Sequence, residues 1–141
     1  MHKKDQGKLG ESAVITQALQ NGSEVFVDFG DNSKIDLILN TAQGLIRVQV
    51  KCYTPTRGGI EVYFTKSGPN YSFRYEDHQV DYFAVVNAND ISQIAWLKAS
   101  DVLAQYSRSC ILRIEPTKNN QTSGIVWFKD YQQFPFGPLA Q

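Results

Sequence analysis

The sequence predicts a single α/β domain, residues 1–141, in which helices flank a mixed, mostly antiparallel β-sheet. Three observations support this class. A helical segment opens the chain, short segments rich in β-branched and aromatic residues follow it, and Gly, Pro and Asn separate these segments. A helix followed by consecutive strands and a late second helix is typical of one α/β domain, and 141 residues suffice to bury its core.

The first element is a helix over residues 6–21, which ends before Gly22, a residue favoured just after helices. At about 100° per residue, Glu11 falls at the centre of an apolar stripe, while Leu9 and Ala13 fall on the far side. The stripe consists of Val14, Ile15, Ala18 and Leu19. A buried carboxylate is costly unless it is paired or binds a metal, whereas one in the first helical turn is stabilised by the helix dipole and by water. Both interpretations of Glu11 stay open.

The later elements are mainly strands separated by turns. Strands are predicted at residues 24–29, 35–39, 45–51, 60–65, 80–87, 94–97 and 110–115, and a short helix at 99–106. The strand at 94–97 is expected to pair antiparallel with the strand at 80–87, because a short turn joins them. Turns are predicted at 30–33, 40–44, 55–59 and 68–70, a polar loop at 118–123, and a non-helical tail at the end.

The segment from residue 34 to residue 51 organises the rest of the chain, because it has the pattern of two strands joined by a turn. If Asn40 lies opposite Leu45, the apolar side chains share one face, since side chains alternate and opposed residues lie on the same face. The apolar pairs are Leu39 with Ile46, Leu37 with Val48, and Ile35 with Val50. The other face carries Asp36 opposite Gln49, Lys34 opposite Lys51, and Ile38 opposite Arg47. A shift of one residue would mix the two sets, so the pattern favours this register.

The polar face of this hairpin has two interpretations. The ordinary one is the solvated side of an amphipathic hairpin. The other is a metal and phosphate site, in which Asp36 binds a divalent cation and the Gln49 side-chain oxygen or the Val50 carbonyl completes its ligands. Lys51 would then hold the attacking water or the phosphate. The hairpin alone leaves both interpretations open.

Composition excludes several classes of protein. Apolar residues make up 42% and charged residues 20% of the chain, as in an ordinary globular domain. Cys52 and Cys110 lack the spacing of a disulfide framework or a zinc site. With only His2 and His78, the chain lacks a histidine-rich metal site, and a Ser/His or Cys/His triad is not expected. No apolar segment is long enough to span a membrane, so we expect a cytoplasmic protein without a membrane partner.

The net charge is zero, which by itself argues against a nucleic-acid partner. The charges are nevertheless distributed unevenly along the chain. Between residues 47 and 74 the only acid is Glu61, whereas the cations are Arg47, Lys51, Arg57, Lys66 and Arg74. A local excess of cations is compatible with contacts to a phosphate backbone.

The order of the polar residues resembles the PD-(D/E)xK nuclease superfamily, whose members share the restriction-endonuclease-like core. The helix carries Glu11, the first hairpin strand carries Asp36, and the second carries Gln49 and Lys51 as Q-x-K. More closely, five segments between Lys3 and Gln121 are similar to the bacterial group I intron-encoded homing endonucleases. These segments are G-K-L-G-E-S, I-D-L-I-L, V-Q-V-K, V-D-Y-F-A-V-V and L-R-I-E-P-T-K-N-N-Q.

The resemblance implies a site-specific endonuclease that hydrolyses phosphodiester bonds of double-stranded DNA with Mg²⁺ or another divalent cation. The implied catalytic residues are Glu11, Asp36, Gln49 and Lys51, and the implied metal ligands are Glu11, Asp36 and Val50. The chain departs from the usual pattern at two positions. Ile35 stands where a proline is usual, which leaves the carboxylate chemistry of Asp36 unchanged. Gln49 replaces the usual acid, and its neutral oxygen attracts a cation less than a carboxylate does.

Two other functions stay open within the same fold. One is a structure-specific nuclease of the Holliday-junction-resolvase type, and the other is a DNA-binding module that does not cleave, which Gln49 favours. The candidates for DNA contact are Lys3, Lys8, Arg57, Lys66, Tyr71 and Arg74.

A break in both DNA strands requires two active sites, so we expect a homodimer, and the resemblance suggests a dimer of dimers. An apolar tail near the C-terminus either packs against a partner chain or folds back over its own domain. The tail residues are Tyr131, Phe134, Pro135, Phe136 and Leu139.

Overall fold

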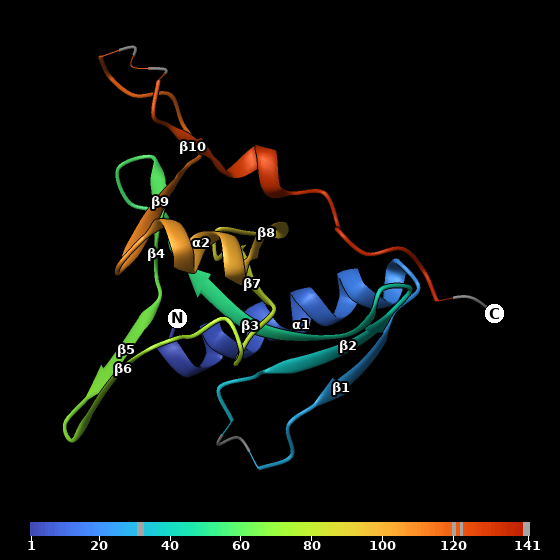
Figure 1. Ribbon diagram of the computed structural model, residues 1–141. Helices are drawn as coiled ribbons and strands as arrows, with labels where there is room; N and C mark the ends of the chain where they lie inside the picture. The colour runs from blue at the N-terminus through green and yellow to red at the C-terminus, as the bar shows by residue number, and fades with distance from the viewer. Residues whose placement is uncertain (31–32, 120, 122, 140–141) are drawn as a thin grey trace.

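The centre of the molecule is a five-stranded sheet with the strand order β1-β2-β3-β7-β8 (Figure 1). The computed structural model describes residues 1–30, 33–119, 121 and 123–139. The strands of this sheet are β1 (Glu24–Val27), β2 (Leu37–Thr41), β3 (Gly44–Tyr53), β7 (Tyr82–Asn87) and β8 (Asp90–Lys98). Neighbouring strands are antiparallel except β3 and β7, which are parallel. The predicted mixed, mostly antiparallel sheet is confirmed.

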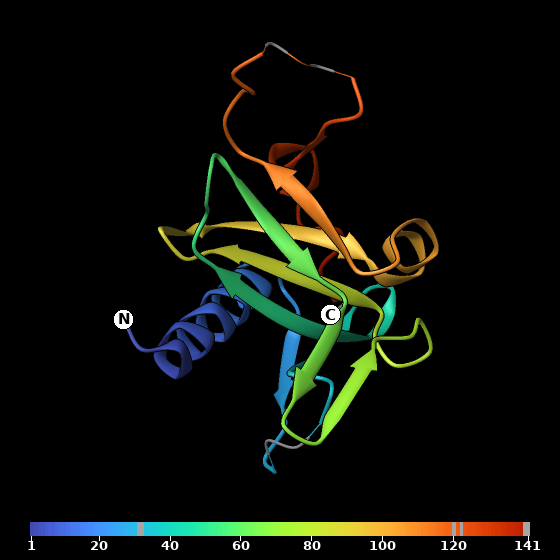
Figure 2. The ribbon, with the colours of Figure 1, turned by 90° about the vertical axis from the view of Figure 1, so that its left-hand side faces the viewer.

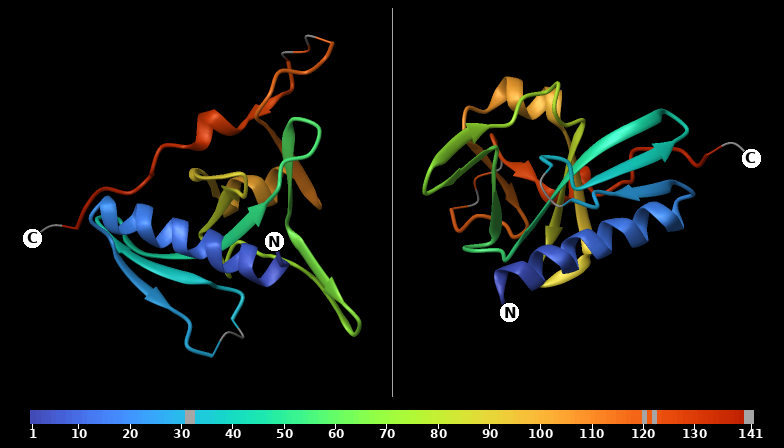
Figure 3. Two further views of the ribbon diagram at one scale, coloured as in Figure 1. Left: turned by 180° about the vertical axis from the view of Figure 1, so that it is seen from behind. Right: turned by 90° about the horizontal axis from the view of Figure 1, so that it is seen from below.

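Helix α1 (Lys3–Gln20) covers one face of the central sheet, as the left panel of Figure 3 shows from behind. The helix approaches β3 closely at Gly10, where a Cβ atom would lie 2.6 Å from the Cβ of Cys52. The buried residues of the helix are Gly10, Ala13, Val14 and Ala18. The predicted stripe is confirmed at Val14 and Ala18, which are buried, but it is wrong at Leu19, which is 57% exposed, and it left out Ala13, which is buried. Small residues allow the close approach and so decide which side of the helix meets the sheet.

The opposite face of the central sheet is covered by helix α2 (Ala99–Gln105) and by a smaller sheet (Figure 2). The smaller sheet has the order β10-β9-β4, formed by Val126–Trp127, Ser109–Arg113 and Gly59–Tyr63. The sequence prediction that β9 is the last strand is wrong, since β10 pairs with it in parallel. Phe83, Val85 and Leu97 of the central sheet pack against this layer.

A two-stranded hairpin, β5 (Thr65–Gly68) and β6 (Tyr71–Arg74), projects from the body of the molecule after β4 (Figures 1 and 2). The predicted turn at residues 68–70 connects its two strands. The strand β6 itself was not predicted, because its residues combine aromatic side chains with Ser and Arg in a short segment.

The C-terminal tail folds back over the face of the central sheet that α1 also covers. Phe136 is 4% exposed, and its ring centroid lies 4.9 Å from that of Tyr82 and 5.7 Å from that of Trp96. Backbone hydrogen bonds fix the end of the tail, because Ala42 N–H donates to Gly137 and Leu139 N–H donates to Gly22. The tail therefore covers its own sheet, and the expectation of a homo-oligomer loses this support. A short 3-10 helix, η1 (Phe128–Tyr131), precedes the tail.

Cys52 and Cys110 are both free thiols, Cys52 half-buried and Cys110 buried. In the part of the chain that the structure describes, no helix combines the length and the apolar composition needed to cross a bilayer. The predicted turn at 30–33 and the predicted loop at 118–123 lie partly outside the described residues.

Candidate active site

The site is built on the hairpin of β2 and β3, whose predicted register is confirmed from Leu37 onward. The pairs are Leu37 with Val48, Ile38 with Arg47, Leu39 with Ile46, and Asn40 with Leu45. Upstream of Leu37 the regular ladder ends, because β2 begins at this residue. The three predicted pairs on that side, Asp36 with Gln49, Ile35 with Val50 and Lys34 with Lys51, therefore lie outside the ladder.

Asp36 leaves the register in the manner of a β-bulge, a feature that redirects side chains. Its backbone N–H donates to the carbonyl oxygen of Val48 at 2.9 Å, although Leu37 is the ladder partner of Val48. Its Oδ2 accepts a hydrogen bond from the N–H of Val50 at 2.8 Å. Because the N–H and C=O of one strand residue point to the same side, the Val50 carbonyl faces the same opening between the strands. Asp36 also lines an open hollow of about 200 Å³ beside β1 and β2.

The side-chain amide oxygen of Gln49 is buried and accepts no hydrogen bond from the described residues. Gln49 and Lys51 lie on the same face of β3, since their positions differ by two residues. The Oε1 atom of Gln49 is shielded from solvent and accepts no hydrogen bond within the described residues. An acceptor buried in this way is costly unless another group satisfies it, and a cation can do so.

The oxygen atoms at this opening fit a hard divalent cation such as Mg²⁺. They are the Asp36 carboxylate and the Val50 carbonyl oxygen, and the neighbouring Gln49 adds an unsatisfied amide oxygen on the same strand; all are of the type that Mg²⁺ prefers. Over residues 1–30, 33–119, 121 and 123–139, no three His, Cys, Asp or Glu side chains form a cluster that could hold a metal ion. A cation at this site would therefore need neutral oxygen ligands as well as carboxylates.

Lys51 is buried, and its ammonium group lies over two aromatic rings. Its Nζ is 5.0 Å from the ring centroid of Tyr75 and 5.8 Å from that of Phe83. Burial lowers the pKa of Lys51 to about 8, the nearby charge of Asp36 opposes this change, and Lys66 adds to it. Since this pKa remains above 7, Lys51 is mainly protonated at neutral pH, and the faces of the rings stabilise its charge.

Glu11 lies on α1 directly after Gly10, where the helix crosses β3. A Cβ on Gly10 would lie 3.5 Å from Val50 Cγ1, and the side chain of Gln6 donates to the Cys52 carbonyl at 2.8 Å. Glu11 is half-buried at the border of the helix contact face, so its predicted position at the centre of a buried stripe is wrong. Glu11 thus lies on the α1 side of the sheet, next to the glycine that approaches the Val50 side chain.

The six predicted DNA contacts lie on three parts of the surface. All six are exposed: Lys3 and Lys8 on α1, Arg57 in the turn after β3, and Lys66, Tyr71 and Arg74 on the β5–β6 hairpin. Arg74 also ties the hairpin to the body of the molecule. Its guanidinium donates to the carbonyl oxygens of Tyr106 at 2.8 Å and Ser107 at 2.9 Å, and also to that of Leu103.

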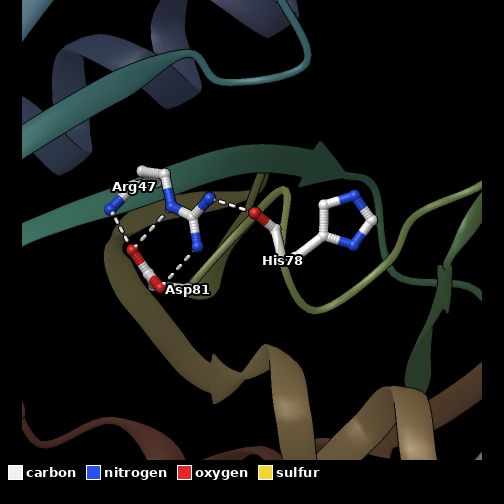
Figure 4. A network of polar contacts seen from close by, with 3 residues as sticks. All are labelled: Arg47, His78 and Asp81. Atoms are coloured by element: carbon white, nitrogen blue, oxygen red, sulfur yellow. Dashed lines mark hydrogen bonds and ion pairs between the residues drawn. The ribbon is translucent and has the colours of Figure 1, made fainter.

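Arg47 anchors β3 to the segment that leads into β7 (Figure 4). Its Nε and Nη2 donate to the carboxylate of Asp81 at 3.0 and 2.9 Å, and its backbone N–H donates to the same carboxylate at 2.8 Å. Its Nη1 donates to the carbonyl oxygen of His78. These hydrogen bonds lower the pKa of Asp81. The sequence analysis counted Arg47 only as one cation of a basic segment, because Asp81 lies far along the chain.

Sequence reasoning also missed the two rings beneath Lys51. Alternation within the strand predicted at 80–87 places Phe83 and Val85 on one face, but it does not say which face meets Lys51. Tyr75 lies in a segment for which no element was predicted. Only the packing of the two layers brings these rings to the lysine.

The fold is shared with a nuclease of known structure. A bacterial homing endonuclease, I-Ssp6803I, matches with a TM-score of 0.72 over 94% of this chain and 89% of that chain, at 20% sequence identity. The fold is therefore of the restriction-endonuclease-like class that the sequence resemblance implied. Among curated proteins, no sequence matches the chain.

The family follows from a comparison of the sequence with family models. The model of the PD-(D/E)XK endonucleases matches residues 1–134. The chain belongs to the PD-(D/E)XK endonuclease family and is a nuclease.

Proposed function

We propose that this nuclease is a site-specific DNA endonuclease of the intron-homing type, which hydrolyses phosphodiester bonds of double-stranded DNA with Mg²⁺. One observation carries the proposal. Where the β2–β3 ladder opens, Asp36 accepts a hydrogen bond from Val50 N–H and its charge acts on the buried ammonium group of Lys51, while Gln49, between Val48 and Val50 on the same strand, has an unsatisfied oxygen. This combination suits a phosphate ester, which needs cationic and metal-binding groups side by side.

The proposed metal ligands are Asp36, Glu11 and the Val50 carbonyl oxygen, with Gln49 as a neutral ligand. Glu11 would approach from α1, which packs against Val50. When bound, a divalent cation polarises a phosphoryl oxygen and lowers the pKa of a coordinated water. The N–H of Val50 orients the Asp36 carboxylate, because it donates to Oδ2.

The proposed role of Lys51 is to hold the nucleophile or to donate to a phosphate oxygen. The rings of Tyr75 and Phe83 confine its ammonium group, so its position is set before the substrate binds. In a partly dehydrated site, the charge of Lys51 stabilises a developing negative charge more strongly than it would in water. Catalysis would thus depend on positioning and electrostatics, as is usual for phosphoryl transfer.

The direct test is a cleavage assay on supercoiled plasmid DNA and on a library of linear duplexes, with Mg²⁺ and with EDTA. The proposal expects Mg²⁺-dependent linear product with defined ends. Binding without cleavage would favour the non-cleaving module, for which Gln49 is the supporting feature. Preferential cleavage of a synthetic four-way junction over linear duplex would favour the resolvase type.

We further propose that the chain acts in the cytoplasm as one domain that assembles into a dimer or a dimer of dimers. The support is the edge strand β1, where Phe26 is 53% and Val27 is 65% exposed. An apolar edge strand is a ready partner for a second copy. Sedimentation with and without DNA should show an oligomer that Phe26→Ser with Val27→Ser disrupts. A monomer under both conditions would leave the enzyme a nickase.

A further inference from the structure

The two faces of the projecting β5–β6 hairpin differ in chemistry. The ladder pairs Lys66 with Phe73 and Gly68 with Tyr71, which places these four residues on one face. The other face carries Thr65, Ser67, Ser72 and Arg74. We call the first set the aromatic face and the second set the hydroxyl face. Residues 65–74 contain no acidic residue, so the hairpin as a whole is cationic.

A third chain segment adds a cation to the aromatic face. Lys34, in the loop that leads into Asp36 and β2, places its Nζ 4.4 Å from the ring centroid of Phe73. Lys34 and Lys66 are both exposed, and Lys66 is near enough to Lys51 to affect its pKa. The cations therefore extend from the hairpin to the catalytic lysine.

Aromatic rings continue along the same path. The rings of Tyr71 and Phe73 are stacked with centroids 6.3 Å apart, and Phe73 meets the edge of Tyr75 at 5.2 Å. Tyr75 in turn packs against Phe83 at 5.5 Å, and Lys51 lies over both of these rings. An unbroken row of rings thus connects the tip of the hairpin with the candidate active site.

Gly68 fixes the position of the outermost ring. Tyr71 lies across the ladder from Gly68, and a Cβ on Gly68 would be 2.4 Å from Cε1 of that ring. The ring therefore covers the glycine, an arrangement known to stabilise glycines in sheets. Tyr71 remains 50% exposed, so its outer side is available to a ligand.

The base of the hairpin is tied to the body. Arg74, on the hydroxyl face, donates to three carbonyl oxygens at the end of α2 and in the turn that follows. At the base, Tyr75 N–H donates to the Phe64 carbonyl and Phe64 N–H donates to the Arg108 carbonyl, both at 2.8 Å. These bonds hold the aromatic face at a fixed orientation relative to Lys51.

We infer that the aromatic face, together with Lys34, binds the sugar-phosphate backbone of duplex DNA beside the scissile phosphate and leads that strand to Lys51. The inference rests on the proposed function, which supplies duplex DNA as the substrate. Lys34 and Lys66 pair with phosphates, while Tyr71 packs against the sugar edge. Strands of four residues extend about 13 Å, so the contacts cover about four base pairs on one side of the cut.

The test measures the equilibrium binding of the full chain to duplex DNA in EDTA. Fluorescence anisotropy is the readout, and the salt concentration is varied between about 50 and about 200 mM. Lys34→Gln and Lys66→Gln should each reduce the salt slope by about 0.9 and the affinity at about 0.1 M salt by about eight-fold. Lys129→Gln is the matched control, since Lys129 also lies over a ring, that of Trp127 at 5.5 Å. Ser67→Ala and Ser72→Ala control for the hydroxyl face. All three controls should bind like wild type.

A double-mutant cycle tests the position of the ring without removing a charge. Gly68→Ala should displace the Tyr71 ring and weaken binding as much as Tyr71→Ala does. Adding Gly68→Ala to Tyr71→Ala should then change nothing further. Circular dichroism melting of each variant separates weakened binding from loss of fold. If Gly68→Ala does not fold, the variants of the exposed Lys34 and Lys66 still test the proposal.

The outcomes separate this inference from the proposed function. If Lys34→Gln and Lys66→Gln retain the salt slope of Lys129→Gln, while wild type binds and cuts DNA, the inference is wrong and the proposed function stands. Additive effects of Gly68→Ala and Tyr71→Ala would likewise overturn the role of the ring. If the wild-type protein binds no duplex at any salt concentration, both proposals are wrong.

Discussion

The two hairpins of this molecule have the same secondary structure but opposite surroundings. The β2–β3 hairpin lies within the central sheet, where Leu37, Leu39 and Val48 are fully buried. The β5–β6 hairpin forms its own two-stranded sheet, and most of its residues are exposed. The comparison separates two requirements of a nuclease: chemistry requires charges held in a dry, packed setting, whereas capture of a substrate requires charges presented to solvent.

Lys51 and Lys66 illustrate the difference in one residue type. Burial lowers the pKa of Lys51 to about 8, and two rings confine its ammonium group. Lys66 is exposed and lies on a hairpin that projects from the body. A confined charge can act on a transition state, while a mobile, hydrated charge contributes mainly to binding.

The largest expected effect is at the buried hairpin. Asp36→Ala should reduce the rate of single-turnover cleavage by about 10³-fold or more, because it removes the carboxylate proposed as the principal charged metal ligand. DNA affinity in EDTA should change little. Asp36→Asn is the matched variant, since its amide oxygen can still accept the hydrogen bond from Val50 N–H. If Asp36→Asn cleaves DNA at a nearly wild-type rate, the assignment of Asp36 as a metal ligand is wrong.

The next effect distinguishes the two hairpins directly. Lys51→Ala should lower kcat at saturating DNA by about 10²-fold to 10³-fold, because it removes a preorganised charge from the site. Lys66→Ala should act chiefly on Kd and on the salt dependence. Both are measured by titrating DNA in a single-turnover assay. Equal losses of kcat in the two variants would contradict the division of roles.

An intermediate effect is expected where the projecting hairpin joins the body. Arg74→Ala removes hydrogen bonds to three carbonyl oxygens, so the free energy of unfolding should fall by about 1–3 kcal/mol. DNA affinity should fall as well, because the hairpin loses its fixed orientation. Lys129→Ala is the control, since Lys129 is an exposed cation outside the hairpin. Thermal melting and anisotropy measure the two quantities, and an unchanged Tm for Arg74→Ala would show that the anchor is dispensable.

A smaller effect is expected at Gln49. Gln49→Glu should keep or increase Mg²⁺ affinity, by about ten-fold at most, and should retain at least part of the activity, because it nearly preserves shape and adds a charged ligand. Calorimetric titration with Mg²⁺ measures the affinity. Weaker Mg²⁺ binding would mean that the oxygen of Gln49 does not face the cation.

The smallest effect concerns the anchor of the buried hairpin. Asp81→Asn should cost about 1 kcal/mol of unfolding free energy at pH 7, given an ion pair with Arg47 in which both side chains are 33% exposed. Because hydrogen bonds from Arg47 lower the folded-state pKa of Asp81, this stabilisation is present above the unfolded-state pKa and is lost as pH falls through the folded-state pKa. Denaturant melts from pH 7 to about pH 3 should show the difference between variant and wild type shrinking. A pH-independent difference would show that the carboxylate charge is not responsible.

The sequence by itself determined the hairpin register from Leu37 to Leu45 and the shared face of Gln49 and Lys51. Alternation along a strand is a local property, so a stretch of apolar and polar residues suffices to predict it. The order of Glu11, Asp36, Gln49 and Lys51 along the chain also sufficed to suggest the family. These conclusions needed no knowledge of what packs against the hairpin.

Only the tertiary structure decided how these residues are used. The bulge directs Asp36 to the N–H of Val50, the closely packed Gly10 turns α1 so that Glu11 lies at its border, and rings from distant segments confine Lys51. The same packing brings Arg74 to the Tyr106 carbonyl oxygen, to which it donates a hydrogen bond, and brings Phe136 against Tyr82 of the central sheet. The physical reason is that periodicity tells which residues share a face, whereas the partner of each face is set by contacts between segments far apart in the chain.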